Sequence, residues 1–254
     1  MIVFLSLVIN MERYIGITGF KTKEEIDACI EESSGKEPMI MYGILTSPKN
    51  FSNIAREGSR RPAFINLASL LEYVPKSAMP TIHHCSNNRQ ISSELDTLLI
   101  ADDIYDRGLC KAIQINQRLP DVKEIKTFKK KYSDIKIILQ LEPEDIADPK
   151  ATGQIVNNYE GLVEYVIIDP SKGIGKELNV YDTLKVLNNL KINAMPVIAG
   201  GLSAENVGAV VKFFRKEYGD GFCIDVEGKI RDVEDKLSVE KMTSYIKEAY
   251  KVYR

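Results

Sequence analysis

The chain has 254 residues, of which 44% are hydrophobic and 28% are charged. This composition is typical of a globular protein, and it excludes disordered, collagenous and coiled-coil chains. The 34 lysines and arginines nearly balance the 36 aspartates and glutamates, and no long block of one charge sign is present. We therefore expect no nucleic-acid partner, because such a partner needs a basic surface.

Two features bear on where the protein works. The four cysteines are far apart in the sequence and none belongs to a CxxC motif. Because the chain is also large enough to bury its own core without disulfides, we predict reduced thiols in a cytoplasmic protein. Met1–Ile9 is the one run that resembles a targeting segment, but it lacks a positive region and a cleavage site and is far too short for a membrane span. It is either an added first strand turn or an over-long start with the true initiator at Met11. We favour the second, and expect no membrane partner.

Eight short apolar runs, many of them β-branched, are bounded by Gly, Pro, Asn or Asp. They are apolar throughout and do not alternate with polar residues, which is typical of strands buried on both faces of a parallel sheet. The predicted strands are Tyr14–Thr18, Met39–Leu45, Thr81–Cys85, Lys111–Ile115, Ile135–Leu141, Glu164–Asp169, Met195–Ala199 and Gly221–Val226.

Segments with helical spacing lie between these runs, and each carries an apolar stripe that would pack on the sheet. Thr22 and Glu25 form a capping box before the first helix, and Ser203 is the expected N-cap of the seventh. The stripes are Phe64, Leu67, Leu71 and Val74; Val122, Ile125 and Phe128; Val180, Leu184 and Leu187; Val207, Val210, Val211 and Phe214; and Val239, Met242, Ile246 and Ala249.

The spacing of the predicted elements selects the fold. Eight strands and about eight helices in 254 residues give about 32 residues per unit, the size of one strand–helix crossover. That is typical of a (β/α)8 TIM barrel, whereas a doubly wound sheet has fewer strands and a GxGxxG turn after its first strand. We predict an α/β fold with a single barrel domain over residues 11–254. The longest connection, residues 47–62, is polar and carries Arg56, Arg60 and Arg61, so an active-site lid would lie there.

In a barrel, functional residues lie at the C-terminal ends of the strands and in the loops that follow. Polar residues and glycines gather at these positions, which identifies the functional face and not the reaction. They are Gly16, Thr18, Lys49, His83, His84, Asn87, Gln114, Asn116, Asp169, Gly200, Gly201, Asp225 and Glu227.

The strongest local signal is the turn after the seventh strand. Gly200 and Gly201 let the backbone approach a ligand, and the free N–H groups that open the next helix favour an anion. Because barrels commonly bind phosphate after strands seven and eight, we predict a phosphate monoester here, with Ser203 beside it. The alternative is a tight turn that needs glycine only for a positive φ.

A second signal follows the sixth strand, where Asp169 precedes a loop that contains Gly173, Gly175 and two lysines. A carboxylate at the mouth of a barrel can act as a general acid, and such a loop can close over a charged substrate. Alternatively, Asp169 only caps its own loop.

Six motifs follow one another in the order found in one family of barrel enzymes. They are Gly16-Ile-Thr18 (GIT in the family), Ser47-Pro-Lys49 (SPR), Gln114-Ile-Asn116 (QLHG), Gly173-Ile-Gly-Lys176 (GSGK), Ala199 to Val207 (GGLNPENV) and Asp225-Val226 (the start of DVSSGVE). From about Arg13 onward the chain therefore resembles phosphoribosylanthranilate isomerase, which performs an Amadori aldose-to-ketose rearrangement in tryptophan biosynthesis.

The resemblance implies that Asp169 is the general acid and that a small phosphorylated substrate is bound without a cofactor. The implied substrate and phosphate contacts are Gly200, Gly201, Ser203, Gly173, Gly175, Lys49, Gln114 and Asp225.

The chain also departs from the family pattern. The family's general base is a cysteine immediately before GIT, and Ile15 stands there. Lys49 replaces an arginine that helps to hold the anthranilate end, a point charge in place of a bidentate fork. Asn116 takes the place of a histidine. Glu227 and Gly228 replace paired serines of the phosphate pocket, and a carboxylate there would repel phosphate.

His83, His84 and Cys85 are the candidates for the missing base. Successive strand residues face opposite sides, so at least one histidine faces the barrel interior, and both are candidate catalytic residues. The alternative is one core histidine and one packed on the helices. A metal site that joins either histidine to Asp225 or Asp102 lacks an HxH or HExxH spacing, so no metal is predicted.

Three functions stay open from the sequence. The first is an Amadori-type isomerisation of a phosphorylated sugar adduct, as the resemblance implies. The second is different chemistry on a phosphate-bearing metabolite on the same scaffold. The third is a non-catalytic relative that binds a phosphate-containing ligand.

Overall fold

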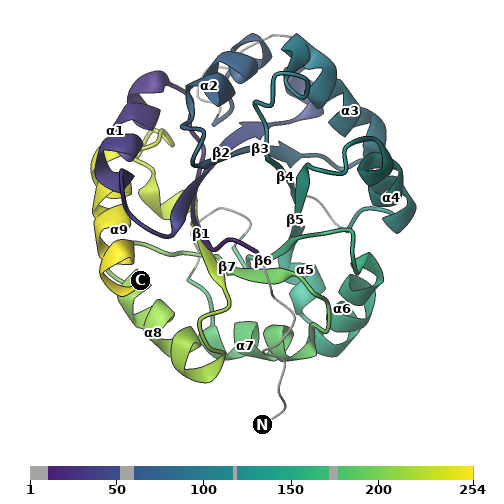
Figure 1. The fold of residues 1–254 in the computed structure, drawn as a ribbon. Helices are drawn as coiled ribbons and strands as arrows, with labels where there is room; N and C mark the ends of the chain where they lie inside the picture. The colour runs from purple at the N-terminus through teal and green to yellow at the C-terminus, as the bar shows by residue number, and fades with distance from the viewer. Residues whose placement is uncertain (1–10, 52–59, 117–118, 172–176, 254) are drawn as a thin grey trace.

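The structure is a computed structural model that describes residues 11–51, 60–116, 119–171 and 177–253. Residues 1–10, residues 52–59 of the long connection, and Gly173 and Gly175 lie outside this part of the chain, so the predictions made for them stay predictions. Eight parallel strands pair in chain order and β8 pairs back to β1, which closes a barrel (Figure 1). The strands are β1 (Tyr14–Thr18), β2 (Met39–Thr46), β3 (Met79–Cys85), β4 (Ala112–Asn116), β5 (Lys136–Leu141), β6 (Tyr165–Ile168), β7 (Met195–Ile198) and β8 (Cys223–Val226).

A ring of helices surrounds the strands, as the view along the barrel axis shows (Figure 1). The predicted single-domain (β/α)8 barrel is thereby confirmed. The helices are α1 (Lys23–Ser33), α2 (Leu67–Tyr73), α3 (Ser92–Ile100), α4 (Val122–Lys131), α5 (Pro143–Ile146), α6 (Pro149–Val156), α7 (Val180–Asn189), α8 (Val207–Glu217) and α9 (Val239–Val252).

One of the two predicted helix starts is correct. The Thr22 hydroxyl accepts a hydrogen bond from the Glu25 amide, and the Glu25 carboxylate accepts one from the Thr22 amide, so the capping box before α1 is present. The prediction for Ser203 is wrong, because α8 begins only at Val207. The side chain of Asn206 takes over this turn: it accepts from the Ser203 amide and donates to the carbonyl of Gly201.

The barrel separates two hydrophobic cores. One fills the space between strands and helices, and contains Ile15 and Ile17 of β1. The other fills the barrel interior and draws on alternate strand residues such as Tyr14, Met79 and Cys223. The same alternation determines which residues at the C-terminal ends of the strands face the barrel interior. A residue an even number of positions from an interior-facing residue also faces the interior, and the residues on either side of it face the helices.

Two further observations concern the whole described chain. None of its helices is both long enough and apolar enough to cross a membrane. The four cysteines, Cys29, Cys85, Cys110 and Cys223, are all free, as the sequence predicts.

Candidate active site

A polar pocket lies at the C-terminal mouth of the barrel, above the apolar interior. We call it the mouth pocket; its space, including the open mouth, is about 340 Å³. Alternation along β3, β4, β5, β6 and β8 brings one polar side chain from each strand end into it, so sequence-distant residues meet. It is lined by His83, Gln114, Gln140, Ile167, Asp169, Ser171, Ala199, Gly200, Gly201, Leu202, Asp225, Val226, Glu227, Gly228 and Lys229.

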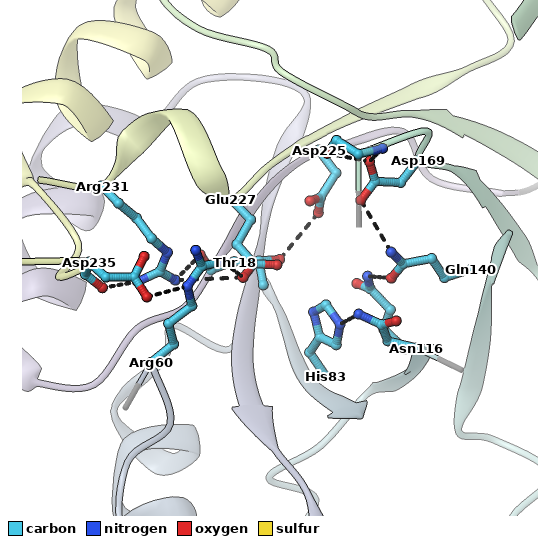
Figure 2. Close-up of polar contacts among 12 residues, drawn as sticks. Thr18, Arg60, His83, Asn116, Gln140, Asp169, Asp225, Glu227, Arg231 and Asp235 are labelled. Carbon is cyan, nitrogen blue, oxygen red and sulfur yellow. Dashed lines mark hydrogen bonds and ion pairs between the residues drawn. The ribbon is translucent and has the colours of Figure 1, made fainter. Parts of the chain in front are cut away.

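Ser171 and Gln140 donate hydrogen bonds to the Asp169 carboxyl group. The amide and the hydroxyl of Ser171 donate to its Oδ1 at 2.8 and 2.7 Å, and Nε2 of Gln140 donates to its Oδ2 at 3.2 Å (Figure 2). These hydrogen bonds fix the orientation of the Asp169 carboxyl group at the edge of the pocket. Asp169 therefore caps its own loop and also lines the pocket, and its role as a general acid stays a prediction.

Asp225 is in the opposite situation. Its side chain is buried, and the Thr18 hydroxyl donates to its Oδ2 at 3.4 Å (Figure 2). Burial raises the pKa of Asp225 well above its usual value, and the negative charges of Glu227 and Asp169 raise this pKa further. The pocket thus contains one carboxyl group, Asp225, that favours holding its proton, close to a second carboxyl group, Asp169.

Glu227 is paired with cations, which changes its effect on an anionic ligand. Nη1 of Arg60 lies 2.7 Å from Glu227 Oε1, and Nε of the same arginine lies 2.7 Å from Asp235 Oδ2 (Figure 2). Nη2 of Arg231 lies 4.0 Å from the same Glu227 oxygen. Hence the repulsion of phosphate that Glu227 alone would cause is offset by two guanidinium groups. Arg60 also fastens the end of the long connection to the loop after β8.

The glycine pair after β7 has open backbone donors. Gly200 and Gly201 have φ values of 101° and 65°, which glycine adopts without the steric cost that other residues meet. Among the described residues, the amides of Gly200, Gly201 and Leu202 make no hydrogen bond, and all three residues line the mouth pocket. Ser203 follows them but does not line the pocket.

The two adjacent histidines separate, as the alternative from the sequence anticipated. His83 lines the pocket; Nδ2 of Asn116 lies 3.0 Å from its Nε2, and burial lowers its pKa to about 3. His84 points outward, with Nδ1 3.0 Å from the Thr46 hydroxyl and Nε2 2.9 Å from Glu94. His84 therefore faces the outside of the barrel and does not line the mouth pocket with the other candidate catalytic residues, His83 and Asp169.

Two more expectations are changed by the structure. Lys49 is exposed and does not line the mouth pocket. Ile15 packs between strands and helices, so a side chain at this position cannot reach the pocket at all. On β1 the inward position at this level is Gly16, and Asp225 Oδ2 lies 2.1 Å from where a Cβ on Gly16 would stand. The carboxylate of β8 thus occupies the space of a side chain on β1.

Some pocket residues were missed by sequence reasoning. Gln140 is the one polar residue between the ends of an otherwise apolar strand, which was a usable signal. Ser171 lies in a loop and Lys229 in the short 3-10 helix Gly228–Ile230 after β8, and neither had such a signal. No group of three or more His, Cys, Asp or Glu side chains in the described ranges is arranged to hold a metal ion.

The fold and site define a (β/α)8 barrel with a carboxylate-containing pocket at its C-terminal mouth. No family model matches the chain, and no curated protein matches its sequence. Solved structures match its fold. Phosphoribosyl anthranilate isomerase from Thermus thermophilus is 13% identical, with a TM-score of 0.65, over 93% of this chain and 97% of that one.

The same enzyme from Thermotoga maritima is 16% identical, with a TM-score of 0.65, over 94% of this chain and 98% of that one. The tryptophan synthase α subunit from Legionella pneumophila is 10% identical, with a TM-score of 0.58, over 95% and 92%. At such identities the likeness shows the fold alone, because one barrel supports many reactions.

Proposed function

We propose that this chain is an acid–base enzyme that isomerises a phosphorylated sugar adduct from an aldose to a ketose, an Amadori-type reaction. The observation that carries the proposal is the pair Asp169 and Asp225, two carboxyl groups in one pocket: Asp169 accepts hydrogen bonds from Ser171 and Gln140, and burial raises the pKa of Asp225. Such a pair supplies an acid and a base at the same pH.

The reaction needs both groups. A proton delivered to the ring oxygen of the aldosylamine opens the ring and leaves a protonated imine at C1. A base then removes the proton from C2; the electron pair of that bond forms a C1–C2 double bond, and the imine π pair moves to nitrogen. The resulting enolamine takes a proton on C1 while its C2 hydroxyl releases a proton, and C2 becomes the carbonyl carbon of the ketose. Proton transfers of this kind typically contribute 10²–10⁴-fold each.

The hydrogen bonds support a specific division of roles. Asp225 carries the proton and donates it, while Asp169 is the carboxylate that accepts one from C2. This reverses the role that the family resemblance implies for Asp169. The position of Asp225 over Gly16 also supplies a titratable group where β1 has no side chain.

The phosphate end is assigned to the turn after β7. The open amides of Gly200, Gly201 and Leu202 face the pocket, and Lys229 adds a cation at its edge. With Glu227 paired to Arg60, these donors favour a phosphate monoester.

The experiment follows the loss of phosphoribosylanthranilate fluorescence with the wild type, Asp169→Asn and Asp225→Asn. We expect turnover by the wild type and a fall in kcat of roughly 10²–10⁴-fold in each variant. If Asp225 is the acid, wild-type activity falls at high pH, because Asp225 loses its proton there. The activity that remains in Asp225→Asn should not show this fall at high pH. Asp182→Asn, an exposed carboxylate on α7, is the control and should keep full activity. No turnover at high enzyme concentration contradicts this exact reaction.

A second candidate is the isomerisation of a sugar phosphate without an anthranilate group. It is favoured by the position of Lys49, which is exposed and does not line the mouth pocket, so this residue is not placed there to hold an anthranilate carboxylate. Incubation with ribose 5-phosphate, followed by NMR detection of ribulose 5-phosphate, separates the two candidates.

A further inference from the structure

The floor of the mouth pocket contains two buried polar atoms without a partner. Nδ1 of His83 and Oε1 of Gln114 have no hydrogen bond, and their side chains are 1% and 2% exposed. They are the only pocket-lining atoms in this state within the described chain. His83 and Gln114 are also paired across β3 and β4, so their side chains stand next to each other on the inner face. Leaving buried polar groups unpaired is costly, so this pair needs an explanation.

Asp169 determines what Gln114 presents to the pocket. As a carboxylate, Asp169 only accepts hydrogen bonds, so Gln140 must turn its Nε2 toward it. The Oε1 of Gln140 then faces Gln114, which donates from its Nε2 at 2.9 Å. Because the Nε2 of Gln114 donates to Gln140, the Oε1 of Gln114 is the atom left without a hydrogen bond. This relay therefore ends in a fixed acceptor.

Asn116 determines in the same way what His83 presents. In the orientation that the Asn116 amide has here, its Nδ2 lies 3.0 Å from Nε2 of His83 and can only donate, which corresponds to the tautomer without a proton on Nε2. Because burial keeps the imidazole neutral, the single ring proton resides on Nδ1. His83 therefore offers a fixed donor next to the fixed acceptor of Gln114.

We propose that His83 and Gln114 together bind one hydroxyl group of the substrate, which accepts from His83 Nδ1 and donates to Gln114 Oε1. The inference rests on the proposed function and narrows its substrate class. A carboxylate or a phosphate dianion cannot donate to Gln114, and an ammonium cannot accept from His83. Only a group that does both satisfies the pair, and on a phosphorylated sugar that group is a hydroxyl.

This assignment makes the pocket selective for an intact sugar. An analogue without the hydroxyl that reaches the floor leaves both His83 and Gln114 buried and unpaired. Sites built to bind a hydroxyl reject the analogue that lacks it far more strongly than apolar pockets reject a missing methylene. The discrimination appears in binding alone and does not need turnover.

The test measures dissociation constants by calorimetry for ribose 5-phosphate and for three analogues, each lacking the hydroxyl on C1, C2 or C3. We expect one analogue to bind the wild type at least tenfold more weakly than ribose 5-phosphate, and the other two to bind within about threefold of it. In Gln114→Leu this discrimination should fall below threefold.

His83 provides a matched pair of variants. His83→Asn keeps an N–H donor near the position of Nδ1 and should retain the discrimination, whereas His83→Gln keeps one near Nε2 and should lose it. Circular dichroism and thermal melting establish that each variant is folded.

Three outcomes are distinguishable. Discrimination by the wild type that disappears in Gln114→Leu supports the assignment. Equal binding of all four compounds to the wild type overturns it and leaves phosphate binding intact. No binding of any of them overturns the proposed function, and this inference with it.

Discussion

The carboxylate of Asp225 stands directly over Gly16. The two residues are paired across β8 and β1, and Oδ2 of Asp225 lies 2.1 Å from the point where a Cβ on Gly16 would be. A side chain on β1 and this position of Asp225 therefore exclude each other.

Gly16→Ala should consequently disturb Asp225. The added methyl group forces the carboxylate out of its place in a closely packed interior, and overpacking of this kind typically costs about 1–3 kcal/mol. Each kcal/mol corresponds to a fall of about 2–4 °C in Tm for a domain of this size. Thermal melting measures the effect. In an Asp225→Ala background the same change should cost clearly less, and Gly221→Ala, which meets no atom within 4 Å, should leave Tm unchanged. An equal loss in both backgrounds contradicts the prediction.

Acid should destabilise the protein through His83. Its pKa is about 3 in the fold and 6.5 without the fold, so between these values the unfolded chain binds a proton that the folded chain does not. The free energy of unfolding therefore falls as pH drops from 6.5 toward 3, and recovers as pH rises. Urea unfolding at pH 5.0 and 7.5 should show this slope reduced in His83→Asn. Part of it remains, because burial also lowers the pKa of His84. If the change in unfolding free energy with pH is the same in His83→Asn as in the wild type, His83 is protonated or exposed in the folded protein, which contradicts the prediction.

Arg60 should contribute measurably to stability although it comes from the long connection. Its guanidinium bridges Glu227 and Asp235 at 2.7 Å each, and its loss leaves a half-buried Glu227 with only Arg231 at 4.0 Å. Arg60→Ala should lower the free energy of unfolding by roughly 1–2 kcal/mol, since charged hydrogen bonds are involved. The control is Arg107→Ala, whose ion pair with Glu72 is exposed and should count for less than about 1 kcal/mol. Chemical denaturation measures the free energy of unfolding of both variants. Equal losses in Arg60→Ala and Arg107→Ala would contradict the bridging role of Arg60.

Gly200→Ala should abolish the response to phosphate. Residue 200 has a φ of 101°, and a Cβ would lie 2.9 Å from Cδ of Pro170, so the turn must shift. Inorganic phosphate at about 100 times its dissociation constant should stabilise the wild type by about 2.7 kcal/mol, and the variant hardly at all. Gly219→Ala carries similar backbone strain, with a φ of 99°, but meets no atom within 4 Å. It should lose intrinsic stability and keep the phosphate response, which differential scanning calorimetry can measure. A phosphate response that survives in Gly200→Ala moves the anion site elsewhere.

The sequence was sufficient for the architecture. All eight strands begin and end within two residues of the predicted ranges, because strands buried on both faces are apolar throughout and are flanked by turn residues. It was less informative for the helices: α3 and α6 were not singled out, and α8 begins three residues later than a start capped by Ser203 would give. Local capping signals do not reveal that Asn206 closes the preceding turn through contacts with Ser203 and Gly201.

The composition of the site was only partly accessible. Gly200, Gly201, Gln114, Asp169 and Asp225 were named from the sequence and line the mouth pocket. Whether they bind and catalyse as proposed stays a prediction.

The sequence alone determined that polar residues gather at the C-terminal ends of eight strands, and that one of two adjacent histidines faces inward. Only the closed barrel decided which one. Closure fixes the register between neighbouring strands, and register places His83 beside Gln114 and Asp225 over Gly16. It also brings Arg60 to Glu227, 167 positions further along the chain. Contacts of this kind depend on distances between strands and loops that are remote in sequence, and no local pattern of residue types encodes those distances.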